Sequence, residues 1–338
     1  MPNNHARTSF ISPMAAQKLG EVGDIVWNDG EYDKQTMANL LDGADICVTG
    51  WGCPSLDKEV LHNVSRLRLV AHTGGSVAAI VSPALYDKGV TVISGNALYA
   101  ESVAEGTLAY ILTGLRRIPY FAGNVQKGVW RSDGYQNKGL FDKKIGLAGF
   151  GAITRELVPM LKPFRNEVMV FSRHLSDEDC QKYSMIRAES MEQLFSSCEI
   201  ISLHMARTPE TFHAVNKRLL ALMPDGALLV NTARGSVVDE QALAEELRTG
   251  RIHAVLDVFE DEPLPIDSPL KGLDNAVLIP HMGGPTGDRH ERVTLALIED
   301  MRRILAGQPL LYEIKREQAL RMTNDAIVFP KTNEENAE

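Results

Sequence analysis

Apolar positions in the first part of the chain alternate between short β-rich runs and stretches with helical spacing. The runs at residues 6–12, 24–29, 44–51, 67–75 and 90–95 predict strands, and the spacing at residues 33–43 and 54–65 predicts helices. Alternation of this kind is typical of an α/β layer architecture.

A longer apolar stripe follows. Residues 101–118 predict one amphipathic helix, after which Pro119 interrupts the pattern and residues 128–144 form a glycine-rich polar loop. We therefore expect a domain junction here, with residues 1–118 and 290–338 in one discontinuous domain and residues 119–289 in the other.

The second half repeats the alternation. Apolar runs of strand length occupy residues 144–150, 168–173, 199–205, 226–233, 253–259 and 276–281, and helical spacing occupies residues 157–164, 239–250 and 286–306. The pattern predicts an α/β protein with doubly wound parallel sheets. The helix over residues 286–306 is expected to return the chain to the first domain.

Composition excludes several classes of partner. The 338 residues carry a formal net charge of -9, which argues against nucleic acid or an anionic membrane surface. The four cysteines show no zinc-like spacing, so we expect reduced thiols and no metal. No signal peptide or run of about 20 apolar residues is visible, which predicts a cytoplasmic protein. The polar end at residues 331–338 is expected to fray.

A glycine-rich turn lies between a predicted strand and a predicted helix. Gly149 allows a tight turn, and Gly151 lets the backbone approach a pyrophosphate. The next amides, at Ala152 and Ile153, begin a helix whose positive dipole end favours phosphate. A simple strand-to-helix connection is the alternative. Thr154 stands at the third glycine position, so helix and strand are expected to pack less closely.

The second strand of this unit ends in Ser172 and Arg173, where an NAD site usually places an acid on the ribose. Without that acid a 2′-phosphate is not repelled, and Arg173 can pair with it. The sequence therefore favours NADP(H) among the NAD(P) cofactors. A solvated surface charge is the other interpretation of Arg173.

Three side chains suited to carbonyl chemistry follow later strands: Arg234, Glu262 and His281. Arginine matches a carboxylate bidentately, and histidine transfers protons near neutral pH. A glutamate beside that histidine would raise its pKa. Taken singly, each has a structural alternative: an ion-pair or capping arginine, a solvated acid and a structural histidine.

The motifs around these residues, NTARG, DVFEDEP and HMGGPT, follow the GFGAIT turn in one order. In this respect the chain resembles the D-isomer-specific 2-hydroxyacid dehydrogenases, a family that includes glyoxylate and hydroxypyruvate reductases and D-3-phosphoglycerate dehydrogenases. The resemblance implies a Rossmann dinucleotide-binding domain and a flavodoxin-like substrate domain. It also implies reduction of a small 2-oxo acid to its D-2-hydroxy acid.

The resemblance also assigns roles. Arg234 would bind the substrate carboxylate and polarise the carbonyl, His281 would be the general acid, and Glu262 would keep it protonated. The loop at Gly74, Gly75 and Ser76 would hold the carboxylate through backbone amides. The cofactor would contact Gly149, Phe150, Gly151, Ala152, Ile153, Ser172, Arg173, His204, Thr208, Thr232, Ala233, Asp257, Gly283 and Gly284.

Other interpretations remain open. Corepressors that sense a dinucleotide resemble this family, as do phosphite dehydrogenases. Formate dehydrogenases that resemble this family lack the glutamate partner of the histidine, so Glu262 argues against that class. The resemblance implies a homodimer that associates through the helix at residues 101–118, although that helix could instead be buried within one chain. The loop after Gly75 lacks the usual aspartate, which leaves the substrate open; Trp51 and Tyr99 are candidates to line its cleft.

Overall fold

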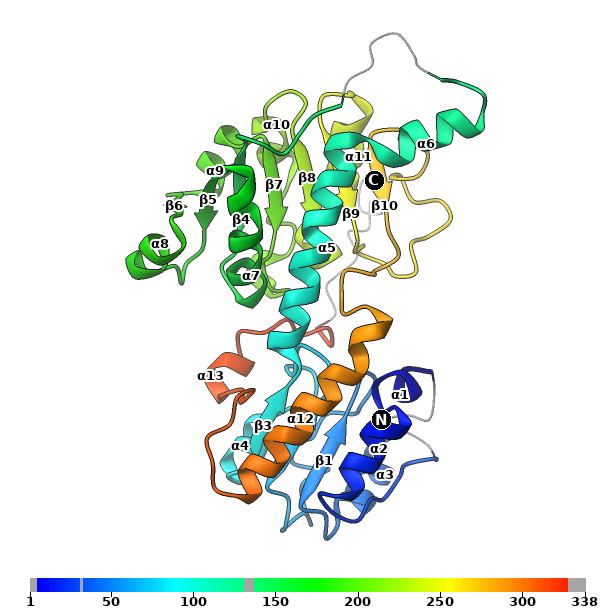
Figure 1. The fold of residues 1–338 in the computed structure, drawn as a ribbon, viewed down its shortest axis with the longest axis vertical. Helices are drawn as coiled ribbons and strands as arrows, with labels where there is room; N and C mark the ends of the chain where they lie inside the picture. The colour runs from blue at the N-terminus through cyan, green and yellow to red at the C-terminus, as the bar shows by residue number, and fades with distance from the viewer. Residues whose placement is uncertain (1–4, 31–32, 131–136, 328–338) are drawn as a thin grey trace, which may run out of the picture. The chain divides into compact units, whose positions relative to one another are not determined.

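The computed structural model describes residues 5–30, 33–130 and 137–327, which separate into two compact units (Figure 1). Unit 1 comprises Met1–Tyr99 and Thr286–Glu338, and unit 2 comprises Ala100–Pro285. The expected domain limits had placed residues 100–118 with the first domain and residues 286–289 with the second. The predicted frayed end at residues 331–338 lies outside the described residues.

Unit 1 contains a parallel sheet of order β1-β2-β3. The strands are β1 (Ile46–Thr49), β2 (Leu69–His72) and β3 (Thr91–Ser94), and the helices are α1 (His5–Phe10), α2 (Pro13–Gly20), α3 (Lys34–Leu41), α4 (Pro83–Asp87), α12 (His290–Leu305) and α13 (Arg316–Ala319). One apolar cluster packs α12 and the segment around Phe10 against one face of the sheet. Helices α3, α4 and α13 contribute to a second cluster.

Two predicted strands of unit 1 are wrong. Residues 6–10 belong to α1 and Ser12 caps α2, because Phe10 is fully buried against α12, where Thr294 donates a 2.7 Å hydrogen bond to its carbonyl. Residues 24–29 form no regular element, and Val26 in this run is 76% exposed. Tertiary packing overrides the β-rich composition of the first run, and the second run lacks the packing that a strand needs.

The predicted helix at residues 54–65 is also wrong, since these residues form turns. Asp57 accepts hydrogen bonds from the backbone amides of Glu59 and Val60 through its side chain, which offers the backbone an alternative to a helix. Leu56 pairs instead with the segment before α4, through a 2.7 Å bond from its amide to the carbonyl of Ile80.

Unit 2 contains a parallel seven-stranded sheet of order β10-β9-β8-β7-β4-β5-β6. The strands are β4 (Lys144–Ala148), β5 (Glu167–Phe171), β6 (Ile186–Arg187), β7 (Ile200–Leu203), β8 (Leu228–Asn231), β9 (His253–Leu256) and β10 (Ala276–Leu278). The α/β class and the predicted strands of this half are confirmed. The order reverses at β4, which makes the sheet doubly wound.

Helices cover both faces of this sheet. They are α5 (Asn96–Arg116), which begins in unit 1, α7 (Ala152–Leu161), α8 (Asp177–Tyr183), α9 (Met191–Ser197), α10 (Lys217–Leu222) and α11 (Glu240–Arg248). Helix α6 (Ile118–Gln126) follows α5 and contains no buried residue. Helices α5 and α7 pack with Leu228 and Val230 on one face, whereas α9, α10 and α11 pack with Leu229 on the other. Alternate side chains of β8 thus enter opposite cores.

The close approach of α5 to the sheet explains why its residues belong to unit 2. A side chain at Gly114 would place its Cβ 2.7 Å from Leu228 and 2.9 Å from Val255. Figure 1 shows α5 running across β8 and β9. The predicted long helix is therefore confirmed, and its second half contributes to the core of the second unit.

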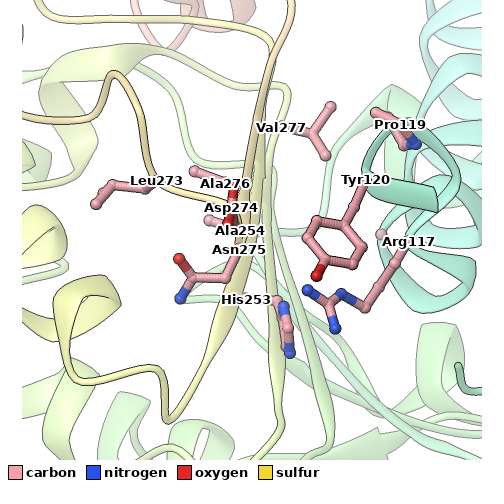
Figure 2. Close-up of a pocket in the computed structure, with 11 residues that line it drawn as sticks. Arg117, Pro119, Tyr120, His253, Ala254, Leu273, Asp274, Asn275, Ala276 and Val277 are labelled. Atoms are coloured by element: carbon pink, nitrogen blue, oxygen red, sulfur yellow. The ribbon is translucent and has the colours of Figure 1, made fainter. Parts of the chain in front are cut away.

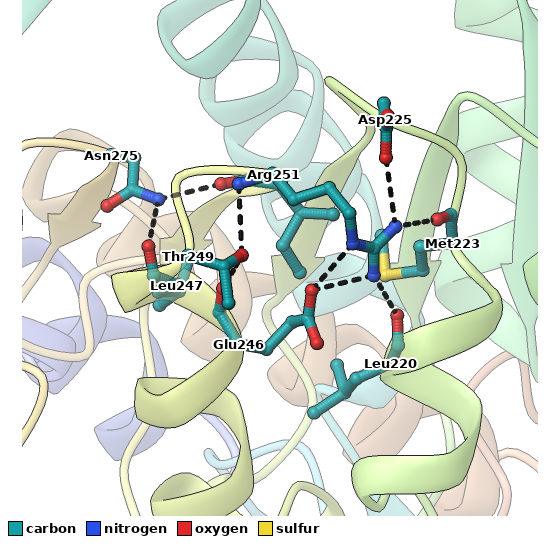
Figure 3. Close-up of polar contacts among 9 residues, drawn as sticks. Leu220, Met223, Asp225, Glu246, Leu247, Thr249, Arg251 and Asn275 are labelled. Atoms are coloured by element: carbon teal, nitrogen blue, oxygen red, sulfur yellow. Dashed lines mark hydrogen bonds and ion pairs between the residues drawn. The ribbon is translucent and has the colours of Figure 1, made fainter.

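Arg251 ties the segment before β9 to two helices (Figure 3). Its guanidinium donates to the carbonyls of Leu220, at 2.9 Å, and Met223, and it pairs with Glu246 at 2.7 Å. These contacts satisfy the carbonyl of Met223 at the end of α10 and add a second donor to that of Leu220, which also accepts the amide of Met223 at 3.2 Å.

No helix in the described parts of the chain combines the length and apolar character that crossing a membrane requires.

Candidate active site

The glycine-rich turn lies at the topological switch point of unit 2, directly after β4. Gly149 has a φ of 114°, and a Cβ there would stand 2.6 Å from the carbonyl oxygen of His204 at the end of β7. Only glycine accepts both the positive φ and this contact. Open α/β sheets bind ligands outside the carboxyl ends of the strands at such a point.

Space remains where a phosphate would approach this turn. Gly151 caps α7, and nothing lies within 4 Å of the position its Cβ would take. The free amides of the first turn of α7 face outward from the helix, as an anion requires. Thr154 does not loosen the packing as expected: it is fully buried and donates a 3.0 Å hydrogen bond to the carbonyl of Gly149.

Ser172 and Arg173 follow β5, the strand beside the turn, and Arg173 is exposed. The positive charge of Arg173 lies near Glu210, whose pKa is lowered mainly by hydrogen bonding to Thr208 and in small part by Arg173. On the other side of the turn, burial lowers the pKa of His204 to about 4, so its ring is neutral. Its Nδ1 is buried without a partner among the described residues.

Arg234 projects from a loop after β8 that the Asn231 side chain holds. The Asn231 amide donates to the carbonyl of Arg234 at 3.0 Å and accepts from the amide of Ala233 at 3.0 Å. A Cβ at Gly235 would overlap the backbone of Phe259, at 1.8 Å from its carbonyl carbon. Gly235 therefore lets the arginine loop lie directly against the loop that carries Glu262.

Thr232, another expected cofactor contact, is buried in this loop. Its hydroxyl lies 3.1 Å from that of Thr107 on α5, so it helps fix the loop to the helix.

Asp257 holds the loop that carries His281. The carboxylate of Asp257 accepts hydrogen bonds from the amides of Met282, at 2.7 Å, and Gly283, at 2.8 Å, and from the hydroxyl of Tyr110 at 3.2 Å. His281 adopts a φ of 51°, which is uncommon for a bulky residue. These bonds hold that backbone conformation, and strained residues of this kind cluster at functional sites.

His281 and Glu262 form a close pair. His281 Nδ1 lies 2.6 Å from Glu262 Oε2, and the other carboxylate oxygen accepts the amide of Phe259 at 3.0 Å. The hydrogen bond that His281 donates to Glu262 raises the pKa of His281, and burial and the charge of Arg234 oppose this shift. Burial would raise the pKa of Glu262, but the bonds from His281 and Phe259 outweigh it and the pKa is lowered.

The arrangement favours the protonated histidine and leaves a second nitrogen for chemistry. With Nδ1 committed to Glu262, Nε2 is the ring nitrogen able to give a proton to a ligand. The positive charge of Arg234 acts on both members of the pair. The structure thus brings together the three residues that the sequence predicted from separate strand ends.

The expected substrate loop lies in unit 1. A Cβ at Gly74 would stand 2.3 Å from Nε2 of His72, whose pKa burial lowers to about 4. Ser94 donates to the carbonyl of Gly75 at 3.1 Å, which fixes the loop. Among the described residues, the amides of Gly74, Gly75 and Ser76 donate to no other group.

Sequence reasoning missed Asn231 and Gly235. Both letters stand in the NTARG motif. A glycine directly after a functional arginine was a usable signal of close backbone approach. The sequence could not identify the segment that approaches Gly235, because Phe259 is distant along the chain.

The glycine turn and the sheet order are those of a dinucleotide-binding α/β domain, and the pair of Glu262 and His281 is a candidate acid–base site. Residues 108–283 match the family model described as D-isomer specific 2-hydroxyacid dehydrogenase, NAD binding domain. The chain belongs to this family, as its motifs predicted.

Individual relatives agree with this membership. The chain is 30% identical to the D-3-phosphoglycerate dehydrogenase of Methanocaldococcus jannaschii over 87% of its own length, but it spans only 56% of that relative. It is 30% identical to the hydroxypyruvate reductase of Thermotoga maritima, over 84% of this chain and 92% of that one. Its fold matches a solved acyclic imino acid reductase in complex with NADPH and D-Arg, with a TM-score of 0.77, 27% identity and coverage of 93% and 98% of the two chains.

Proposed function

We propose that this protein reduces a small 2-oxo acid to its D-2-hydroxy acid by hydride transfer from a nicotinamide cofactor. The observation that carries the proposal is the 2.6 Å pair between Glu262 and His281, within reach of the charge of Arg234. A protonated imidazole beside a guanidinium suits a substrate that has both a carbonyl and a carboxylate.

The residues divide the work. The bound nicotinamide supplies the hydride. Arg234 binds the substrate carboxylate and polarises the carbonyl, and His281 gives its Nε2 proton to the oxygen on which negative charge develops. Glu262 holds the ring and favours its protonated form. Asp257 positions His281 through the backbone of its loop.

The described residues fit a dinucleotide. Gly149 and Gly151 leave an open approach to the amides of α7, and the orphaned Nδ1 of His204 lies beside the turn. The same edge of the sheet bears the other proposed cofactor contacts: Phe150, Ala152, Ile153, Ser172, Arg173, Thr208, Thr232, Ala233, Asp257, Gly283 and Gly284.

NADP(H) is the proposed preference. Ser172 stands where an NAD site usually places an acidic residue that binds the ribose, and the adjacent Arg173 is exposed. Changing Arg173 to Ala should weaken NADPH binding by about tenfold, the loss of one charge-assisted hydrogen bond, and leave NADH binding unchanged. Fluorescence titration with both cofactors measures this. His174→Ala, at the exposed neighbour, is the control, and an equal loss for both cofactors contradicts the phosphate role.

Unit 2 is proposed as the cofactor domain and unit 1 as the substrate domain, with Gly74, Gly75 and Ser76 holding the carboxylate through their free amides. A homodimer is also proposed. Apolar side chains stand exposed on and after α6 rather than on α5, with Ile118 at 53%, Val125 at 48% and Trp130 at 77%, which suits a surface covered by a second copy.

The test is a panel of 2-oxo acids, including glyoxylate, hydroxypyruvate and longer acids, assayed with NADH and NADPH. Oxidation of the cofactor with formation of the D-hydroxy acid is expected. No turnover with any acid and either cofactor, in protein that binds the cofactor, would contradict the proposal.

A further inference from the structure

A pocket in unit 2 lies at the opposite end of the sheet from the proposed active site. It is lined by the junction of α5 and α6, the first residues of β9 and β10, and the turn before β10. His253 begins β9 and Asp257 follows its end, so at about 3.3 Å per residue they stand about 13 Å apart. The pocket therefore has no part in binding at the carboxyl ends of the strands.

Its polar side chains come from two elements and point toward one another. Figure 2 shows Arg117, Tyr120 and His253 converging on one side of the pocket. The guanidinium of Arg117 lies 4.1 Å from the centre of the Tyr120 ring, and its Nε is buried without a hydrogen-bond partner among the described residues. A buried, unpaired donor is costly unless a ligand or water satisfies it.

The junction that presents Arg117 is backbone-strained. Arg117 has a φ of 51°, in the left-handed region, between the end of α5 and the start of α6. Stacking on Tyr120 then fixes the direction of the guanidinium. Strained conformations of this kind are retained where the surrounding structure requires a residue in one direction.

The charge in the pocket suits one negative charge. Burial, and then the nearby cations Arg117 and Lys138, lower the pKa of His253, so near pH 7 its ring is neutral and donates one hydrogen bond. Lys138 already donates to the carbonyl of Gly226 at 2.8 Å. Asp274 lines the pocket and opposes a second negative charge.

The facing side is apolar. Val277 supplies the aliphatic side chain there, because Leu273 and Ala276 pack in the core on the other face of the sheet. The Asn275 amide group donates to the carbonyls of Leu247 and Ile252 and so is already used. A ligand would thus meet one planar guanidinium fork on one side and the side chain of Val277 on the other.

We propose that this pocket binds a small monocarboxylate, with its carboxylate paired to Arg117 and its aliphatic part packed on Val277 and Pro119. A guanidinium matches a planar carboxylate bidentately. A phosphate dianion would lack donors for its third oxygen and would lie near Asp274.

The test observes Arg117 directly by NMR. The Nε–H signal of Arg117 in the full-length, nitrogen-15-labelled protein is followed while sodium isobutyrate is added at constant ionic strength. A saturable shift is expected, together with a shift of the His253 ring signal. Sodium chloride and inorganic phosphate are the comparison probes, and their shifts should be smaller and should not saturate.

Variants separate this pocket from the proposed active site, which also takes a carboxylate. Arg234→Gln should leave the isobutyrate shift of Arg117 unchanged, whereas Arg117→Gln should weaken the response of His253 at least tenfold. Absence of a saturable shift in the wild-type protein overturns the proposal, even if Arg117→Gln fails to fold. A response to chloride equal to that with isobutyrate, or tighter binding of phosphate, overturns the ligand class.

Discussion

Glu262 and His281 move each other's pKa in opposite directions, and this sets the pH range of the proposed chemistry. The hydrogen bond raises the pKa of His281 above its ordinary value and helps to lower that of Glu262. The charged pair therefore persists between the two pKa values. Reduction needs the imidazolium, so activity should fall as the pH rises through the pKa of His281.

Changing Glu262 to Gln should shift the alkaline limb of kcat/KM for reduction to lower pH by about 1 to 2 units, the size of one charged hydrogen bond. The full pH–rate profile measures this. Asp261→Asn removes a neighbouring charge without touching His281 and should shift the limb much less. An unchanged limb in Glu262→Gln would show that Glu262 does not set the protonation of His281.

Glu240 lies beside the same acidic loop and gives a second pH effect, on stability. Burial first, and then the charges of Glu260, Asp261 and Glu262, raise the pKa of Glu240 to about 7 from 4.5. The folded state thus binds this proton more tightly than the unfolded state. The stability it contributes is full below pH 4.5 and is lost as the pH rises through about 7.

Glu240→Gln should therefore raise the Tm at pH 8 by roughly 2–4 °C, equivalent to about 1 kcal/mol, and have little effect at pH 5. The neutral amide still accepts from the backbone of Glu260, which donates to Glu240 at 2.7 Å. Thermal unfolding at both pH values is the measurement. Glu245 lies on the same helix as Glu240 and forms an exposed pair with Lys217 of α10. Glu245→Gln breaks this pair and should not raise the Tm. A fall in Tm at pH 8 for Glu240→Gln would contradict the argument.

At the scale of elements, loops are held by side chains that bond to backbone. Arg251 is the strongest case in unit 2, because it joins the end of α10 to Glu246 on α11, and both Arg251 and Glu246 are largely buried, at 25% and 14% exposed. Removing it leaves the carbonyl of Met223 and the carboxylate of Glu246 without this donor.

Arg251→Met should lower the free energy of unfolding by about 2–3 kcal/mol, which the denaturant midpoint reports. Arg218→Met removes a guanidinium whose pair with Glu192 is 70% and 41% exposed, and it should cost under about 1 kcal/mol. Equal losses of unfolding free energy in the two variants would mean that the Arg251 network stabilises the fold no more than an exposed ion pair does.

Element prediction from sequence succeeded where burial on both faces produced continuous apolar runs, as in β7 and β8. It failed where local composition was ambiguous. The run at residues 6–12 has strand-forming residues, yet it forms a helix whose Phe10 packs on α12. Helix α12 is remote from Phe10 in sequence. At residues 54–65 the deciding contacts are side-chain bonds of Asp57, which periodicity does not encode.

At the scale of the whole molecule, the sequence predicted the class and the position of the turn, and it singled out the three proposed catalytic residues because each follows a strand of a parallel sheet. The carboxyl ends of such strands share one edge, so strand assignment alone places Arg234 and His281 near each other. Gly235 was missed because its neighbour Phe259 is set by tertiary contact. Asn231 was missed because its side-chain bonds to the loop backbone are not encoded in hydrophobic periodicity. The contact of α5 with β8 and β9 likewise fixed the limits of the units.

The most direct test of the central claim is single-turnover hydride transfer in His281→Gln, with the acid that the panel identifies. We expect the rate to fall about 100 to 10,000-fold, as for loss of a general acid, while the dissociation constant of the nicotinamide cofactor stays within about twofold. A fall of less than about tenfold, with cofactor binding intact, would contradict the role of His281 as the proton donor.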